Sequence, residues 1–302
     1  SKPSFGGVIL IAGIATGLIV FALQVKWLWF TQDDAYISYR YARNALSGLG
    51  LVFNAGERVE GYTNFLWVVW LILCGKLGFS FDFAAKALGL ASGAGMIVLS
   101  GLLARDVCVR HYPRASGWVG AGAAILAGVN GSMAYWSVSG LETALFGFLV
   151  TAAVGLWLRG SNLTIPMLAL AVMTRPEGGL IWIVLVVAEW MLGDGPKRAL
   201  ILFGSVAALL LPYGAFKLIY YGSLLPNPFY AKTGFAWEYF ASGLEYAWFF
   251  LRHHGLWGIA LIPVGFSLKA LPGRWRVVPI LWLAFTLYII TVGGDVLRPH
   301  RF

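Results

Sequence analysis

Long runs of apolar residues separated by short polar stretches recur along this chain, and they constrain its fold more than any other feature. A transmembrane helix needs roughly 20 such residues. Charged residues make up only 12% of the 302 residues, against about 25% in an average soluble domain. The sequence therefore predicts an all-α integral membrane protein and excludes water-soluble enzymes, disordered chains and disulfide scaffolds. The nine predicted spans are 7–30, 84–104, 117–138, 143–158, 162–174, 179–192, 199–218, 256–268 and 277–292.

The placement of basic residues predicts the orientation of these spans. The apolar segment 64–78 has about 15 residues, which is short for a span and favours a helix at the membrane surface. If it does not cross, ten basic residues fall in alternate loops with only two acids, and the positive-inside rule places those loops in the cytoplasm. The net charge of +9 then reflects cytoplasmic loops, and a nucleic-acid partner is not expected. The ten are Lys2, Arg105, Arg110, Arg114, Arg159, Lys197, Arg198, Lys269, Arg274 and Arg276.

The opposite face of the membrane receives most of the acidic residues and two long loops. The first loop, 31–82, departs from the rest of the chain in its polarity, and the second covers 219–255. No P-loop, HExxH, G-x-S-x-G or metal-spaced Cys/His motif is present. The chemistry is therefore expected on the outer face. The Gly13/Gly17 and Gly89/Gly93 pairs predict close helix packing.

Asp33 and Asp34, directly after the first span, are the strongest catalytic candidates. Paired carboxylates at a membrane–water boundary can deprotonate a hydroxyl or bind a divalent cation. The following residues are typical of a helix, and an Asp at its start is a good N-cap. One helix needs one cap, so the second carboxylate favours function. Whether a metal binds here stays open.

Further candidates follow in the same loop and at the ends of later spans. Glu60, Tyr62 and Asn64 could bind a sugar, although composition alone equally fits a solvated loop. Glu142 and the pair Arg175 and Glu177 lie at span boundaries, where charged groups usually face a cavity. Arg175 suits a phosphate, because a guanidinium binds phosphate oxygens bidentately. The alternative is a structural Arg175–Glu177 pair.

Two later segments carry the remaining candidates. The outer loop 220–234 is rich in aromatic residues and proline and contains Asn227 and Lys232, which suit a lipid-linked phosphosugar or a membrane interface. The chain ends in a charged cluster of Asp295, Arg298, His300 and Arg301. A cluster of this kind directly after a span predicts that the chain is a fragment of a longer protein.

The polar motifs, taken in order, resemble a known family. DDAYISYRYARNALSGLGLVFNAGERVEGYTNFLW, which starts at Asp33, is followed by SGLET, RPEG, YGSLLPNPFYAK and GGDVLRPHRF. This series is similar to the AftB-like arabinofuranosyltransferases, which belong to the GT-C membrane glycosyltransferases and use polyprenyl-phosphate sugars. The resemblance implies a GT-C transmembrane domain over residues 1–302, with juxtamembrane helices in the first outer loop, and a C-terminal soluble domain beyond residue 302.

The resemblance also implies a reaction at the extracytoplasmic face of the bacterial plasma (inner) membrane. A polyprenyl-phosphate sugar, with arabinofuranose expected, would be the donor, and a cell-envelope glycan or glycolipid would be the acceptor. Asp33 or Asp34 would be the acid/base. The phosphate would contact Arg175, Lys232, Arg298 or Arg301, and Glu142 and Asp295 would orient sugar hydroxyls. A hexose transferase of the same fold and a lipid-linked sugar flippase remain the alternatives.

Overall fold

The computed structural model describes residues 5–109, 112–228, 237–253, 271 and 273–294. Helices and connecting segments make up this part of the chain, and no β-strand occurs in it. The chain divides into two compact units, Ser1–Arg175 and Pro176–Phe302. The predicted all-α membrane fold class is confirmed by this helix content together with the long apolar helices.

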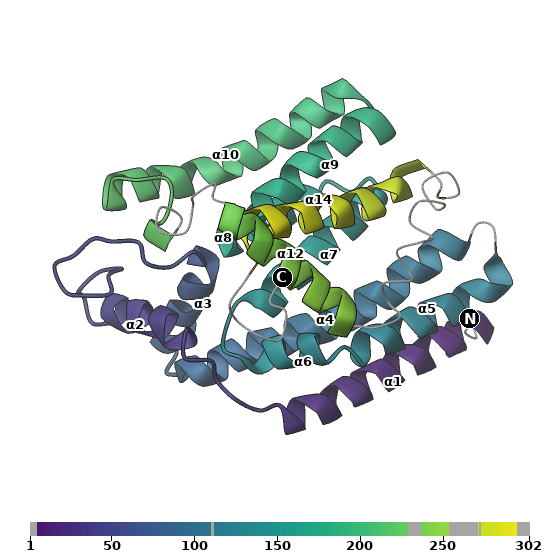
Figure 1. Ribbon diagram of the computed structural model, residues 1–302, viewed down its shortest axis with the longest axis horizontal. Helices are drawn as coiled ribbons and strands as arrows, with labels where there is room; N and C mark the ends of the chain where they lie inside the picture. The colour runs from purple at the N-terminus through teal and green to yellow at the C-terminus, as the bar shows by residue number, and fades with distance from the viewer. Residues whose placement is uncertain (1–4, 110–111, 229–236, 254–270, 272, 295–302) are drawn as a thin grey trace. The chain divides into compact units, whose positions relative to one another are not determined.

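The first unit contains a group of long helices and several shorter ones (Figure 1). Its described helices are α1 (Phe5–Trp27), α2 (Ala35–Leu46), α3 (Phe65–Lys76), α4 (Phe81–Val109), α5 (Pro113–Gly128), α6 (Gly131–Val138), α7 (Thr143–Leu158) and α8 (Thr164–Thr174). Apolar side chains from α1, α4, α5 and α6 form a buried core around Phe21 and Ile97.

Glycines bring the helices of this unit into close contact. Gly13 and Gly17 of α1 lie against α5, and Gly89 and Gly93 of α4 lie against Ser137 of α6, so closely that a Cβ on any of the four would overlap its neighbour. Small residues at such positions let helix backbones approach each other in a bilayer. The prediction that these pairs serve helix packing is confirmed.

The apolar run 117–138 forms two helices, which corrects the single span predicted for it. α5 ends at Gly128, and the side chain of Asn130 accepts a hydrogen bond from the backbone N–H of Met133 at 3.1 Å, which caps the start of α6. A side-chain cap of this kind can start a new helix inside a run that is apolar throughout. The mean hydropathy of 117–138 therefore does not reveal the break. After α6 the chain turns through residues 139–142, and α7 leaves at 119° to α6.

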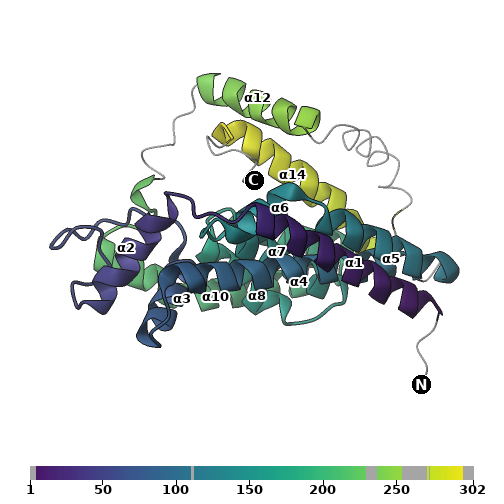
Figure 2. The same ribbon diagram turned by 90° about the horizontal axis from the view of Figure 1, so that it is seen from below.

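α2 and α3 lie within the first outer loop, residues 31–82, and pack together at one end of the unit (Figure 2). α2 is amphipathic and buries Tyr39, Tyr41 and Ala42. α3 has 12 residues, and a helix of that length spans about 18 Å, whereas the hydrocarbon core of a bilayer is about 30 Å thick. Its length agrees with the prediction that 64–78 does not cross the membrane.

α4 separates two charged ends of the first unit. Asp82 and Lys86 lie in its first turns, Arg105 and Asp106 lie near its end, and no charged residue lies between Lys86 and Arg105. The rise of an α-helix places Lys86 and Arg105 about 28 Å apart, close to the thickness of the hydrocarbon core. Asp106 forms an ion pair with Arg159 at the end of α7, with N···O 2.6 Å. Predicted cytoplasmic residues thus gather at one end of this unit.

The second unit contains α9 (Gly178–Leu192), α10 (Pro196–Tyr221), α12 (Trp237–His253), the 3-10 helix η2 (Gly273–Arg276) and α14 (Val277–Val292). α9 contacts α10 and α14, and α12 packs on α14. Near the end of α9, the buried Glu189 contacts Arg274 at 3.2 Å and Arg198 at 3.6 Å, and both arginines also contact Asp194. Two of the loops predicted to share the cytoplasmic side therefore meet in one ion-pair network.

Four described helices are long and apolar enough to cross a membrane, and a fifth crossing results if α6 and α7 count as one bent span. α3, α8 and α9 are apolar but shorter. The predicted span 256–268 lies outside the described residues. The multi-pass character is thus confirmed, and the count of nine spans is not. The four are α1, α4, α10 and η2 joined to α14.

Candidate functional site

Glu142 lies in the turn between α6 and α7, and its side chain is fully buried, with a relative exposure of 0%. The turn, residues 139–142, forms because Gly140 adopts a left-handed conformation with φ +83°, which an L-residue adopts only at a cost. Ser139 closes the turn: its hydroxyl donates to the carbonyl of Trp136 and accepts from the N–H of Leu141. The break between the two helices thus carries a carboxylate into the interior.

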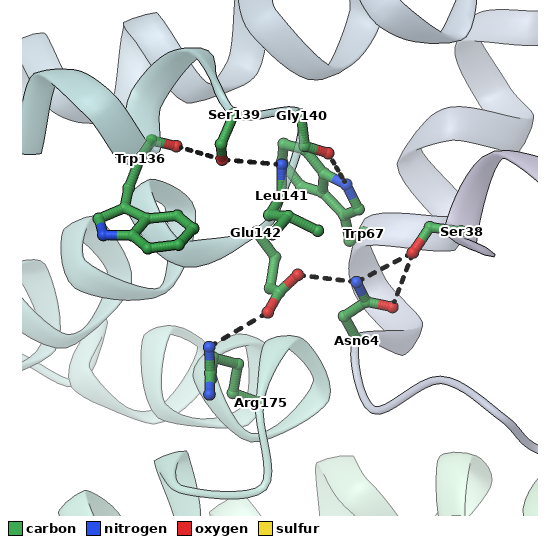
Figure 3. A network of polar contacts seen from close by, with 9 residues as sticks. All are labelled: Ser38, Asn64, Trp67, Trp136, Ser139, Gly140, Leu141, Glu142 and Arg175. Carbon is green, nitrogen blue, oxygen red and sulfur yellow. Dashed lines mark hydrogen bonds and ion pairs between the residues drawn. The ribbon is translucent and has the colours of Figure 1, made fainter. Parts of the chain in front are cut away.

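Two residues predicted from separate motifs contact this carboxylate (Figure 3). Asn64 donates from Nδ2 to Oε2 of Glu142 at 2.7 Å, and Arg175 donates from Nη1 to Oε1 at 3.3 Å. Ser38 of α2 exchanges hydrogen bonds with the Asn64 amide at 3.1 and 3.3 Å. The structure therefore brings three of the predicted site residues together in one network, named here the Glu142 cluster (Ser38, Asn64, Glu142 and Arg175).

The Glu142 cluster contains a buried ion pair. Arg175 is only 7% exposed, and its guanidinium lies 5.9 Å from the centroid of the Phe146 ring. A carboxylate taken out of water is costly unless an opposite charge and hydrogen bonds compensate it. Arg175 ends α8 and Glu142 precedes α7, so the packing of these two helices brings the charges together. Arg175 thus contacts Glu142, and the structural Arg175–Glu177 pair considered as an alternative stays a prediction.

Asp33 and Asp34 form the turn that leads into α2. Asp33 is exposed and accepts through Oδ1 from the N–H of Asp34 and from Gln32 Nε2, both at 2.9 Å. Asp34 is half-buried and occupies the N-cap position, but its side chain makes no capping hydrogen bond. Capping therefore does not explain this carboxylate, and the role of the pair as acid/base stays a prediction.

The Asp33–Asp34 turn is joined to the turn that carries Glu142. The N–H of Gln32 donates to the carbonyl of Ser139 at 2.8 Å. Ala35, which follows Asp34, is fully buried, and a Cβ on Gly140 would lie 2.9 Å from its methyl group. The candidate acid/base residues and the buried carboxylate thus extend from two turns in direct contact.

Trp67 fixes the same turn from the side of α3. Its indole Nε1 donates to the carbonyl of Gly140 at 3.2 Å, and the residue is fully buried. Sequence reasoning missed Trp67 and Ser38 as members of the site. The position of Ser38, one helical turn after Asp34, was the only available signal, and it does not identify Asn64 as a partner.

Glu60 and Tyr62 are buried in the loop before α3. The Tyr62 ring packs edge-on against Tyr41 of α2, with centroids 4.7 Å apart. The Tyr41 hydroxyl donates to the carbonyl of Val59 and accepts from the N–H of Gly61. The solvated loop considered for this segment is wrong at both positions. Tyr62 contacts protein in this packing, and its role as a sugar-stacking ring stays a prediction, as does the role of Glu60.

Burial raises the pKa of two tyrosines of α2. It raises the pKa of Tyr41 above its ordinary value, and it raises the pKa of Tyr39 further, with a smaller contribution from the negative charge of Asp82. The Tyr39 hydroxyl is buried and has no hydrogen-bond partner within the described part of the chain. Both side chains therefore act as neutral phenols.

The other predicted residues belong to the second unit or lie outside the described part of the chain. Glu177, half-buried, precedes α9, and Asn227 is exposed after α10; both belong to the second unit. Lys232, Asp295, Arg298, His300 and Arg301 lie outside the described residues. Their proposed contacts with donor or acceptor stay predictions.

A divalent cation near Asp33 and Asp34 also stays a prediction. Over residues 5–109, 112–228, 237–253 and 273–294, no group of three or more His, Cys, Asp or Glu side chains is placed to bind a metal ion. The two adjacent aspartates are the carboxylates that the first outer loop offers at its start. A metal there would need further ligands from the substrate or from water.

The fold and site define a multi-pass, all-helical membrane protein in which polar side chains from distant segments meet at one end of its first unit. Two curated relatives then identify the chain more closely. It is 30% identical over 279 residues to the terminal β-(1→2)-arabinofuranosyltransferase of Mycobacterium tuberculosis, covering 84% of this chain and 42% of that protein. It is 28% identical over 332 residues to the protein of the same name from Corynebacterium glutamicum, covering 91% and 46%.

These similarities confirm the AftB-like resemblance that the motifs predicted, and the chain spans less than half of the length of the two relatives. No family model matches the chain. No solved structure matches it either.

Proposed function

We propose that this chain is the membrane domain of a glycosyltransferase that moves arabinofuranose from a polyprenyl-phosphate donor to a cell-envelope glycan. The observation that carries the proposal is the contact between the Asp33–Asp34 turn and the turn bearing the buried Glu142. The names of the two relatives support the sugar. The donor follows from the resemblance to polyprenyl-phosphate-dependent transferases.

Asp33 or Asp34 acts as the base in the proposed reaction. The carboxylate takes the proton of an acceptor hydroxyl, and the hydroxyl oxygen forms a bond to the anomeric carbon of the donor sugar. The bond between that carbon and the phosphate oxygen breaks, and polyprenyl phosphate leaves with the electron pair. A positioned base of this kind contributes about 10²–10⁴-fold to a rate.

The Glu142 cluster supplies charge and orientation in this scheme. Glu142, whose carboxylate accepts from Asn64 and Arg175, is proposed to orient a sugar hydroxyl, as the resemblance implies. Arg175 balances the Glu142 charge and is the first candidate to stabilise the leaving phosphate, because a guanidinium binds phosphate oxygens bidentately. Lys232, Arg298 and Arg301 are the other phosphate candidates.

The site is proposed to face the extracytoplasmic side of the bacterial plasma membrane. Arg105 and Arg159 lie at the end of the first unit opposite Asp82 and Lys86. The positive-inside rule assigns the Arg105 end to the cytoplasm. The Thr31–Asp82 hydrogen bond connects the other end with the segment leading to Asp33, which favours an outer location for the site.

An in vitro transfer assay tests this function. The full-length protein in nanodiscs is incubated with radiolabelled polyprenyl-phosphate arabinofuranose and an arabinan oligosaccharide, and the glycan product is analysed. The proposal expects an arabinofuranosyl product. Transfer only from a hexose donor would change the sugar. Donor movement across the bilayer of proteoliposomes, with no product in either system, would identify a flippase and refute the transferase.

A further inference from the structure

The segment between α1 and α2 is short, and it sets where Asp33 and Asp34 lie. Residues 29–32 have no helical structure, and successive side chains in this segment contact different helices. Phe30 packs against Tyr135 of α6 with ring centroids 4.3 Å apart. Trp29 and Thr31, one position to either side, both contact the start of α4.

Two residues one turn apart on α4 make these contacts. The Thr31 hydroxyl donates to Oδ1 of Asp82 at 2.6 Å, and Lys86 donates to Oδ2 of the same carboxylate at 2.9 Å. The Lys86 ammonium also lies 4.8 Å from the centroid of the Trp29 ring. Asp82 and Lys86, which are neighbours on one face of α4, thus contact Thr31 and Trp29, two positions apart in the connecting segment.

The Asp82–Lys86 pair differs from an ordinary surface ion pair. The Lys86 side chain is only 7% exposed, so its charge requires the Asp82 carboxylate. Paired with Lys86 through one oxygen and with Thr31 through the other, Asp82 is already used in structure. The backbone bond from Gln32 to Ser139 fixes the segment on its other side.

We propose that Asp82 is a positioning residue for the Asp33–Asp34 pair, and that it acts through Thr31, two residues before Asp33. The inference rests on the proposed function of that pair. Lys86 fixes the orientation of the Asp82 carboxylate, and Trp29 closes over Lys86. Contacts of the segment between α1 and α2 with α4, α6 and Ser139 thereby set the position of the acid/base carboxylates relative to the turn that carries Glu142.

Thr31→Val tests the inference, because it removes the hydroxyl but leaves the Asp82–Lys86 pair and the side-chain shape. Misplacing a catalytic group by about 1 Å can lower a rate about 100-fold. We expect kcat to fall by roughly 10–100-fold, with an unchanged donor KM, and Thr31→Ser to restore most of kcat. In a background with Asp82→Ala and Lys86→Met, which removes both charges together, Thr31→Val should change kcat no further.

Matched controls come from the same helices. Thr16→Val removes an exposed hydroxyl that bonds within α1, and Asp106→Ala with Arg159→Met removes the ion pair at the other end of α4. Both controls should keep wild-type kcat.

Wild-type kcat in Thr31→Val would overturn the inference. The inference would also be overturned if Thr31→Val lowered kcat as much in the Asp82→Ala/Lys86→Met background as it does in the wild-type protein. If Asp33→Asn and Asp34→Asn both stayed fully active, the proposed base would fail instead. If either aspartate variant were inactive while Thr31→Val kept wild-type kcat, only the inference would fail.

Discussion

Removing Arg175 should destabilise the protein strongly, and removing Glu142 at the same time should restore most of the loss. In Arg175→Met, the fully buried Glu142 carboxylate keeps its bond to Asn64 but loses its contact with the guanidinium. Breaking a buried ion pair by removing one partner costs about 3–5 kcal/mol, whereas replacing both partners by neutral groups is often close to neutral. The variant pair Arg175→Met and Glu142→Gln/Arg175→Met therefore separates charge compensation from packing.

The expected shift is large enough to measure in detergent or nanodiscs. For a unit the size of residues 1–175, 1 kcal/mol corresponds to about 2–4 °C in Tm. Arg175→Met should therefore lower Tm by roughly 6–20 °C. The double variant should regain at least half of this loss, because neither charge of the Glu142–Arg175 pair remains. Transfer activity should be low in both variants, since both lack a proposed site residue.

Thermal unfolding monitored by size-exclusion of a fluorescent fusion measures the effect. Arg159→Met is the matched control, because its ion pair with Asp106 is about 40% exposed on both sides, with side-chain values of 43% and 35%. An exposed pair contributes about 0–1 kcal/mol. If Arg175→Met unfolded at the same temperature as the double variant, the buried pair would not be coupled, and the assignment of Arg175 as the counter-charge of Glu142 would be refuted.

Three further predictions concern the same end of the molecule. Asp33→Asn or Asp34→Asn, at least one of them, should lower transfer by about 10²–10⁴-fold in a radiolabel assay with little change in Tm, because Asp34 makes no capping bond. Single cysteines at Ser47 and Ala115, both exposed, should report opposite faces, with an impermeant thiol reagent labelling intact cells only at Ser47. Gly140→Ala should lower Tm, since a left-handed conformation costs an L-residue roughly 1–2 kcal/mol and its Cβ would lie 2.7 Å from the Tyr39 hydroxyl.

Each of these has a clear contradicting result. Full activity in both aspartate variants would show that neither Asp33 nor Asp34 is the base. Labelling only at Ala115 would show that the topology is the reverse of the predicted one. Ala115 is chosen because the neighbouring Ser116 is buried. Gly56 also has a left-handed φ, +85°, but no atom within 4 Å of an added Cβ. Gly56→Ala therefore measures the backbone cost alone, and an equal loss in Gly140→Ala would exclude a packing contribution at the turn.

Much of the architecture could be predicted from local sequence signals. Hydropathy over about 20 residues identified the long helices α1, α4, α10 and α14, because each must bury its backbone hydrogen bonds inside an apolar stretch. The shortness of 64–78 predicted the short helix α3. The capping signal at Asn130 was overlooked, because hydropathy treats 117–138 as uniform, and the helix break there depends on one side-chain hydrogen bond.

The sequence by itself identified the chemical groups of the site, while only the tertiary structure decided which of them meet. Asp33, Asp34, Asn64, Glu142 and Arg175 stand out locally, because a charged or amide group at the end of an apolar run requires a partner or a function. Their pairing is not local: Asn64 and Glu142 are 78 residues apart, and Glu142 and Arg175 are 33 apart. Such contacts depend on how α3, α7 and α8 pack and on the turn at Gly140, which no period or spacing in the sequence encodes.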